Sequence, residues 1–104
     1  MALEITSNTP IVLDNGIAVS SLYCRTTAEL GSRGDEILAA PTFWASKEAY
    51  SNFQMQVTPL FAKSLKIFAP YDRTTQGTDI LRLSNEWMQI QVDSQGLSST
   101  IIDL

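Results

Sequence analysis

Hydrophobic and polar positions along this chain alternate in ways that predict β-strands and turns. The clearest case is the pair of apolar, β-branched runs Ile11-Val12-Leu13 and Ile17-Ala18-Val19, with Asn15-Gly16 between them. Asn-Gly in that setting is the strongest short-range hairpin signal, because both positions tolerate positive φ. The second run continues as a strand to Thr27. Its apolar groups point both ways, with Ile17, Val19 and Tyr23 on one face and Ala18, Leu22 and Cys24 on the other. We expect it to be covered on both sides.

Glu36 to Ala45 predicts a third strand, in which Phe43-Trp44 is the bulkiest part. Pro41 cannot donate a ladder hydrogen bond, so it implies an edge, a bulge or a strand end. The next residues, Ser46 to Tyr50, predict one helical turn with Ser46 as its N-cap. Strict alternation then predicts a fourth strand that places Phe53, Met55 and Val57 in a core and Gln54, Gln56 and Thr58 outside.

The stretch from Thr58 to Pro70 is ambiguous. Thr58-Pro59 is able to begin a helix, and the spacing of Phe61, Leu65 and Phe68 is helical. Leu65 and Ile67, however, alternate with polar neighbours up to Pro70. We favour a strand, and the helical alternative stays open. A polar loop is expected from Tyr71 to Gly77.

The C-terminal part predicts a helix and a short strand. Thr78 and Asp79 offer N-cap chemistry, and an amphipathic helix is expected from Asp79 to Gln91. Its apolar positions are Ile80, Leu83, Trp87 and Ile90, with Leu81 and Met88 beside them. A strand from Met88 to Val92 is the competing interpretation. Asp93 to Thr100 predicts a loop, and Thr100 to Leu104 a final strand.

These elements predict one domain, residues 1–104, of the mainly β (α+β) class. We expect an antiparallel sheet or a small sandwich of about five to six strands, with one C-terminal amphipathic helix.

The amino-acid composition indicates which classes of partner to expect. Apolar residues make up 44% and charged residues 17% of the chain, which indicates a folded protein. The low charge suits a surface covered by neighbours, and an ordinary monomer with a polar surface fits the composition equally well. The net charge is −4, and the few Lys and Arg residues are scattered. Nucleic acid and anionic membrane surfaces both attract clustered cations, so neither is an expected partner.

Catalytic and metal-binding signatures are missing from the sequence. There is no His, Cys24 is the lone cysteine, and the five glycines are isolated. This removes His-based triads, His metal sites and glycine-rich phosphate loops, so we expect no enzyme activity, no cofactor and no metal. Asp35-Glu36 is a poor acid–base pair, because strand neighbours point to opposite faces. Arg33-Gly34-Asp35 matches an adhesion tripeptide, but a glycine turn between solvated charges is the simpler interpretation.

The start of the chain, Met1-Ala2-Leu3-Glu4, has neither a basic stretch nor an apolar run, so we expect no signal peptide. No apolar stretch approaches the length of a membrane span, so we expect no transmembrane segment. Four aromatic residues are candidate interface residues, although core packing is the default for such side chains. They are Phe43, Trp44, Tyr50 and Trp87.

Three pieces of sequence carry a resemblance: Ile11 to Val19, Tyr23-Cys24-Arg25, and Phe43 to Tyr50. Together they resemble small β-rich virion structural proteins of tailed bacteriophages, which have an Asn-Gly hairpin and an aromatic-Ala-Ser-Lys-Glu-Ala turn. Similar chains often have Gly soon after that turn, where Ser51-Asn52 stands here.

The resemblance implies a non-enzymatic structural subunit, either a capsid cement protein or a tail or baseplate component. Its partners would be copies of itself and other virion proteins, in a symmetric homo-oligomeric assembly, and it would be made in the host cytoplasm and found in the virion. The alternative hypothesis is a small acidic phage-encoded binding module that inhibits or redirects a host protein.

Overall fold

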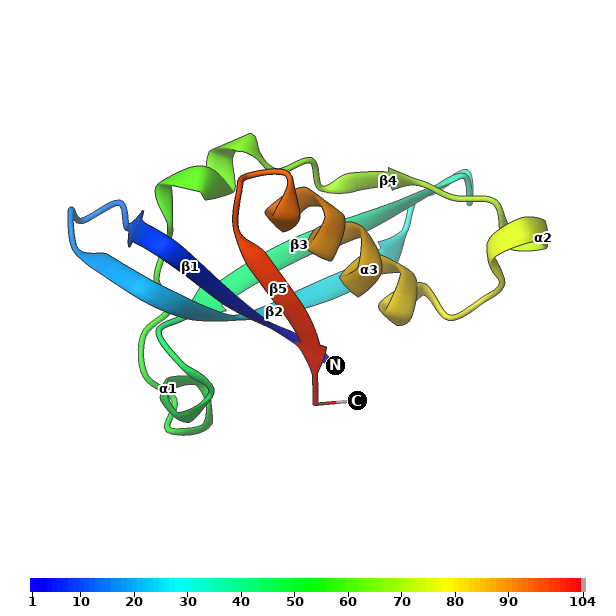
Figure 1. The fold of residues 1–104 in the computed structure, drawn as a ribbon. Coiled ribbons are helices and arrows are strands. Elements are labelled where there is room, and N and C mark those ends of the chain that lie inside the picture. Colours follow the sequence, from blue (N-terminus) through cyan, green and yellow to red (C-terminus); the bar gives the residue numbers. More distant parts are fainter. Residues whose placement is uncertain (104) are drawn as a thin grey trace.

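A computed structural model describes residues 1–103 of the chain. One antiparallel sheet in the order β4-β3-β2-β1-β5 forms its frame, and α3 lies across one face of it (Figure 1). The strands are β1 Ala2–Val12, β2 Ala18–Leu30, β3 Glu36–Trp44, β4 Phe68–Pro70 and β5 Ser98–Ile102. The helices are α1 Lys47–Ser51, η1 Leu60–Ser64 (a 3₁₀ helix), α2 Arg73–Gln76 and α3 Ile80–Asp93. The predicted mainly β class is confirmed, and of its two forms the structure has the five-stranded sheet with a C-terminal helix rather than the sandwich.

The Asn-Gly hairpin joins β1 to β2, as predicted. Leu13 N–H donates to the Ile17 carbonyl at 2.8 Å, and Gly16 N–H donates to the Leu13 carbonyl at 3.0 Å. Gly16 alone takes a positive φ, +85°, whereas both positions had been expected to use that freedom. The turn is therefore a three-residue loop with glycine at its left-handed position. The start of β1 at Ala2 was missed, although Leu3 and Ile5 alternate with Glu4 and Thr6.

The main core lies between the sheet and α3. Cys24 pairs with Leu3 of β1 on one side and with Phe43 of β3 on the other, and all three side chains are buried. Met88 and Val92 of α3 pack into the same cluster. Leu22, Tyr23 and Cys24 are all buried although they alternate in direction, which confirms that β2 is covered on both faces here.

Helix α3 confirms the predicted amphipathic helix and excludes the strand from Met88 to Val92. Asp79 caps it by accepting from Arg82 N–H at 3.2 Å. The buried face differs from the predicted stripe, because Ile90 is 61% exposed whereas Ser84 and Asn85 are fully buried. Ile80, Leu83 and Trp87 pack on a second cluster of Ile37, Ala69 and Tyr71. The helix thus spans two clusters, and the buried Ser84 and Asn85 fall between the residues that pack on each of them.

The preference for a strand between Thr58 and Pro70 was partly wrong. Residues 60–64 form η1, where Phe61 packs edge-on against Phe43 at 5.6 Å, and only Phe68–Pro70 forms a strand. Pro41 lies where β4 has ended. Ala39 and Phe43, two residues before and after it on β3, bond through N–H and C=O respectively to the chain on the β4 side of the sheet. The nitrogen of Pro41 therefore faces the same side, where β4 no longer pairs with β3, and its missing N–H breaks no ladder bond.

Two predicted loops are shorter than expected. The loop from Tyr71 to Gly77 contains α2, which Asp72 caps through Thr74 N–H at 3.0 Å. The loop after α3 ends early, because β5 begins at Ser98 and pairs with β1 from Thr6 back to Ala2. Of the predicted final strand, Leu104 lies outside the described residues.

Ser84 supplies the first prediction. Its hydroxyl oxygen is buried without a hydrogen-bond partner among residues 1–103. Ser84→Ala removes that unsatisfied group and raises helix propensity, so we expect unchanged stability or a gain of up to about 1 kcal/mol. Met88→Ala, one turn further along the same face, should instead cost about 2–5 kcal/mol. Urea unfolding followed by circular dichroism measures both, and a loss above about 1 kcal/mol for Ser84→Ala would show that the hydroxyl has a partner.

Candidate functional site

Helix α1 begins with the N-cap predicted from sequence. Ser46 Oγ accepts a hydrogen bond from Ala49 N–H at 3.0 Å, and Glu48 lies in the first turn. Ala49 is buried, which holds the short helix against the protein. The cap therefore fixes the position of Tyr50 and of the segment that follows.

Tyr50 belongs to an aromatic cluster on the sheet face opposite α3. Tyr23 and Trp44 are cross-strand partners on β2 and β3, so both point to this face. Tyr50 packs against both of them, with ring centroids 4.8 Å from Trp44 and 5.4 Å from Tyr23. The Arg25 guanidinium lies 4.8 Å from the centre of the Tyr50 ring, a cation–π contact.

The chain leaves α1 through a Schellman motif. Gln54 N–H donates to the Ala49 carbonyl at 2.9 Å, and Phe53 N–H donates to the Tyr50 carbonyl at 3.2 Å. This pair of bonds requires a left-handed backbone at Phe53, which has φ +56°. Glycine is the usual residue at this position, because a side chain there is strained.

The predicted strand from Phe53 to Thr58 was therefore wrong. Phe53 is 96% exposed and Met55 is 89% exposed, where both had been placed in a core. Only Val57 makes a β-bridge, to Phe43. The helix cap at Phe53 sets the direction of the chain, and that local hydrogen bonding overrides the alternating pattern.

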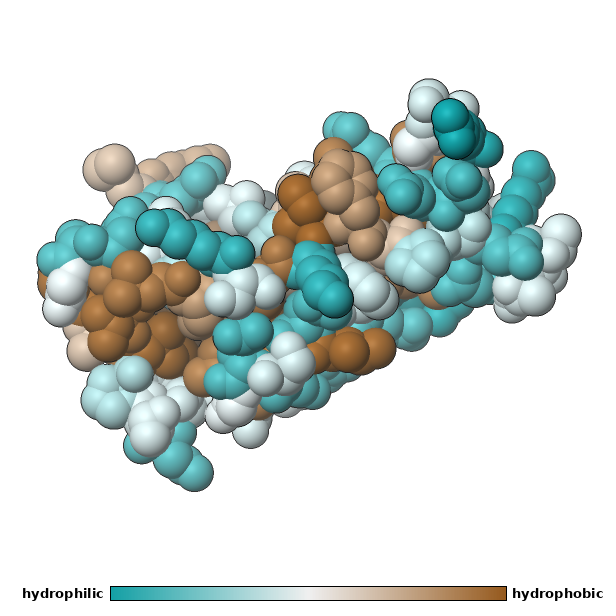
Figure 2. All heavy atoms as spheres, turned by 90° about the horizontal axis from the view of Figure 1, so that it is seen from above, coloured by the Kyte–Doolittle hydropathy of each residue, from teal (hydrophilic) through white to brown (hydrophobic). Residues whose placement is uncertain are grey.

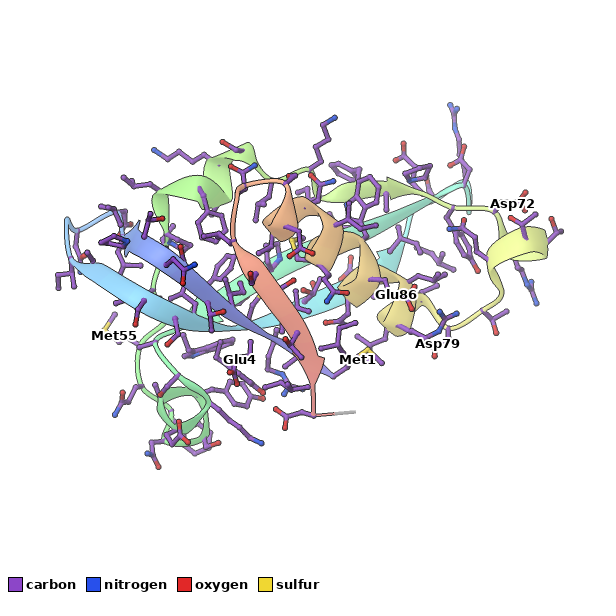
Figure 3. The ribbon with its side chains drawn as sticks, viewed as in Figure 1. Met1, Glu4, Met55, Asp72, Asp79 and Glu86 are labelled. Carbon is purple, nitrogen blue, oxygen red and sulfur yellow. The ribbon has the colours of Figure 1, made fainter. Side chains whose placement is uncertain are left out.

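These side chains border an open hollow with a volume of about 730 Å³. In Figure 3, Met55 lies between the β1–β2 hairpin and α1. No charged residue lines the hollow. Its lining consists of Trp44, Tyr50, Ser51, Phe53, Gln54, Met55, Gln56 and Thr58. We call this hollow, with the projecting Phe53 and Met55, the Phe53 surface.

Other apolar side chains are also exposed. Ile17, Phe68 and Ile90 are each about three-fifths exposed, and Figure 2 shows hydrophobic patches separated by polar groups on the face seen from above. The Phe53 surface differs from them because Phe53 and Met55 are the two most exposed large apolar side chains among residues 1–103, and both line the same hollow.

A polar network supports the aromatic cluster. Tyr23 Oη donates to Asp103 Oδ2 at 2.8 Å, and Arg25 Nη1 donates to Tyr23 Oη at 3.1 Å. Lys47 Nζ, in α1, lies 2.6 Å from Asp103 Oδ1. The hydrogen bonds from Lys47 and Tyr23 lower the pKa of Asp103, whereas burial and the bond to Asp103 raise the pKa of Tyr23. The network links the end of β5 to α1, and through Arg25 to Tyr50.

The structure brings together two of the four candidate interface residues. Trp44 and Tyr50 are half-buried and line the Phe53 surface. Phe43 is only 4% exposed and belongs to the core, because it faces α3 rather than the aromatic cluster. Trp87 is half-buried on α3 and donates from Nε1 to the Lys66 carbonyl at 2.8 Å, away from the other three. Sequence reasoning missed Phe53 and Met55 as surface residues, because no glycine marked the helix end.

The remaining sequence candidates lie apart from this surface. Arg33-Gly34-Asp35 occupies the exposed turn between β2 and β3, with Gly34 at φ +73°. Among residues 1–103, no group of three or more His, Cys, Asp or Glu side chains is placed to hold a metal ion. None of the helices in that range combines the length and hydrophobicity needed to cross a membrane.

Comparison with known proteins gave no match: no protein family, curated protein sequence or solved structure is significantly similar to this chain.

Cys24 gives the second prediction. Its side chain is fully buried, and desolvation raises the pKa of the thiol to about 12. The thiolate is the reactive form, and its fraction at pH 8 falls roughly 1,000-fold when the pKa rises by three units. We expect a maleimide to leave the native protein unlabelled over hours and to label it within minutes in urea, as measured by intact mass. Rapid labelling of the native protein would contradict the buried position of Cys24.

Asp103 gives the third prediction. Its pKa is lower folded than unfolded, so the stability it contributes is present above the unfolded value near 4 and is lost as the pH falls through the folded value. Asp103→Asn removes this contribution. We expect the variant to melt below the wild type at pH 6, and the difference to shrink steadily toward pH 2–3. A difference that is independent of pH would show that the carboxylate charge is not what binds β5 to α1.

Proposed function

We propose that this chain is a non-enzymatic structural subunit of a tailed-phage virion, acting through protein–protein packing. The observation that carries the packing role is Phe53, an aromatic residue 96% exposed in a left-handed backbone position. The left-handed position strains a phenylalanine by about 1–2 kcal/mol, and in an isolated protein the exposed ring gains no hydrophobic free energy to offset that strain. A partner that covers the ring would gain hydrophobic free energy, which would offset the strain at Phe53.

The chemistry of the Phe53 surface supports the same role. Interface cores are depleted in charged residues and enriched in Tyr, Trp, Phe and Met. The hollow is lined by Trp44, Tyr50, Phe53 and Met55 among uncharged polar residues. Such a surface suits a protein partner better than a charged ligand.

The edge of the sheet is a second surface that favours packing. β5 is the last strand in the sheet order, and Ser98 to Ile102 contains no charged residue and no proline. Natural edges usually carry such residues to prevent pairing with other chains. The side-chain hydrogen bonds between α3 and this strand gather at Ser99, whose carbonyl accepts from Gln89 Nε2 at 3.1 Å and whose Oγ donates to Asp93 Oδ1 at 2.8 Å.

The virion setting rests on the resemblance of Ile11 to Val19, Tyr23-Cys24-Arg25 and Phe43 to Tyr50 to small tailed-phage structural proteins. The capped turn in that resemblance is the element from which Phe53 projects. The proposal covers two alternative positions, capsid decoration and a tail or baseplate ring.

The fourth prediction tests it. Quantitative mass spectrometry of purified particles from the source of this chain should detect the protein at many copies per particle. A large copy number indicates capsid decoration, and a small copy number that matches a closed ring symmetry indicates a tail or baseplate ring. Absence from particles, with one stoichiometric host protein recovered from infected cells, would reject the structural role in favour of a host-directed binding module.

A further inference from the structure

We propose that the Phe53 surface is a two-fold contact between copies of this chain, in which Phe53 of each copy enters the hollow of the other. This rests on the proposed packing function and names the partner and the residue that anchors it.

Self-complementarity points to a second copy. The projecting side chains and the hollow lie on one surface, because Phe53 and Met55 are part of its lining. A two-fold axis through such a surface places each projection against the other copy's hollow in a single closed contact. The hollow, at about 730 Å³, is within the size range that takes a whole small ligand, so it has room for a phenyl ring and a thioether.

Charge is compatible with that partner. Each copy carries a net charge of −4, so a contact between copies must bring uncharged surfaces together. The lining of the hollow has no ionisable acid or base apart from the Tyr50 hydroxyl. The nearby Arg25 is engaged with Tyr23 and stacked on Tyr50.

The area fits a modest dimer. A buried aromatic side chain removes about 150–250 Å² from water. Phe53 supplies an area of that order per copy, and the exposed Met55 adds to it. A standard interface buries about 800 Å² per partner. Ser51, Gln54, Gln56 and Thr58 are also exposed around the hollow and add to the area that the contact would bury. We expect a dissociation constant on the order of micromolar, which suffices in an assembly of many copies.

The backbone at Phe53 provides a variant that separates association from folding. Phe53→Gly removes the anchor and also relieves the left-handed strain at φ +56°. The variant should therefore fold at least as well as the wild type while associating more weakly.

The fifth prediction uses sedimentation equilibrium of the 11.5 kDa chain from about 1 to 300 μM, a range around the expected dissociation constant. The wild type should form dimers. Phe53→Gly should weaken them at least about 100-fold, because both symmetric anchors are lost. Phe68→Ala is the matched control, since Phe68 is also exposed, on β4. It should dimerise like the wild type. Thermal melts at concentrations where all three are monomeric should show Phe53→Gly equal to the wild type or a few degrees higher.

A second variant avoids any change of the backbone. Gln56→Glu keeps the size of the side chain and places one carboxylate on each side of the two-fold contact. We expect weaker dimers, recovered in part at pH 4, where the new carboxyl is largely protonated.

Three outcomes would overturn the inference. A wild type that stays monomeric at 300 μM, about 100 times the expected dissociation constant, excludes the contact. Dimers that Phe53→Gly leaves intact place the contact elsewhere. Dimers lost equally in Phe68→Ala show that Phe53 is not a specific anchor. In each case, detection of the protein in particles still supports the packing function, so the two proposals fail separately.

Discussion

Burial of β2 on both faces is the constraint on which the rest of this structure depends. At Leu22–Cys24 the strand turns Cys24 toward α3 and Tyr23 toward α1. Cys24 and its partners Leu3 and Phe43 are the floor on which Met88 and Val92 pack. Tyr23 on the other face holds Tyr50 and, through Asp103, the end of β5. One three-residue stretch therefore positions the long helix, the short helix and the last strand.

The two faces of the sheet differ in how completely the helices cover them. On the α3 side, a helix of fourteen residues covers the sheet and the core is closed. On the other side, α1 has only five residues and covers Tyr23 and Trp44 incompletely. The chain then leaves α1 with Phe53 directed outward. The apolar surface is thus a consequence of how little of this face the short helix covers.

Local hydrogen bonding decides the direction of Phe53. The last carbonyls of α1 need donors, and the N–H groups of Phe53 and Gln54 supply them only if Phe53 is left-handed. Glycine would satisfy the same carbonyls without strain. A phenylalanine at this position therefore gives up stability and leaves its ring exposed.

Local patterns in the sequence determined most of the elements. Asn15-Gly16, the Ser46 cap, the Asp79 cap and the helical spacing after it each act within a few residues, so the hairpin, α1 and α3 are predictable. Tertiary structure alone decided which side chains are covered. Ser84 and Asn85 are buried because α3 spans two clusters, and β5 pairs with β1 because both ends of the chain meet across the sheet. The alternation of Phe53, Met55 and Val57 is the same in a strand and in an exposed loop. Two features distinguish them: the helix cap at Phe53, which is local but is not marked by a glycine in the sequence, and the bridge from Val57 to Phe43, which is a tertiary contact.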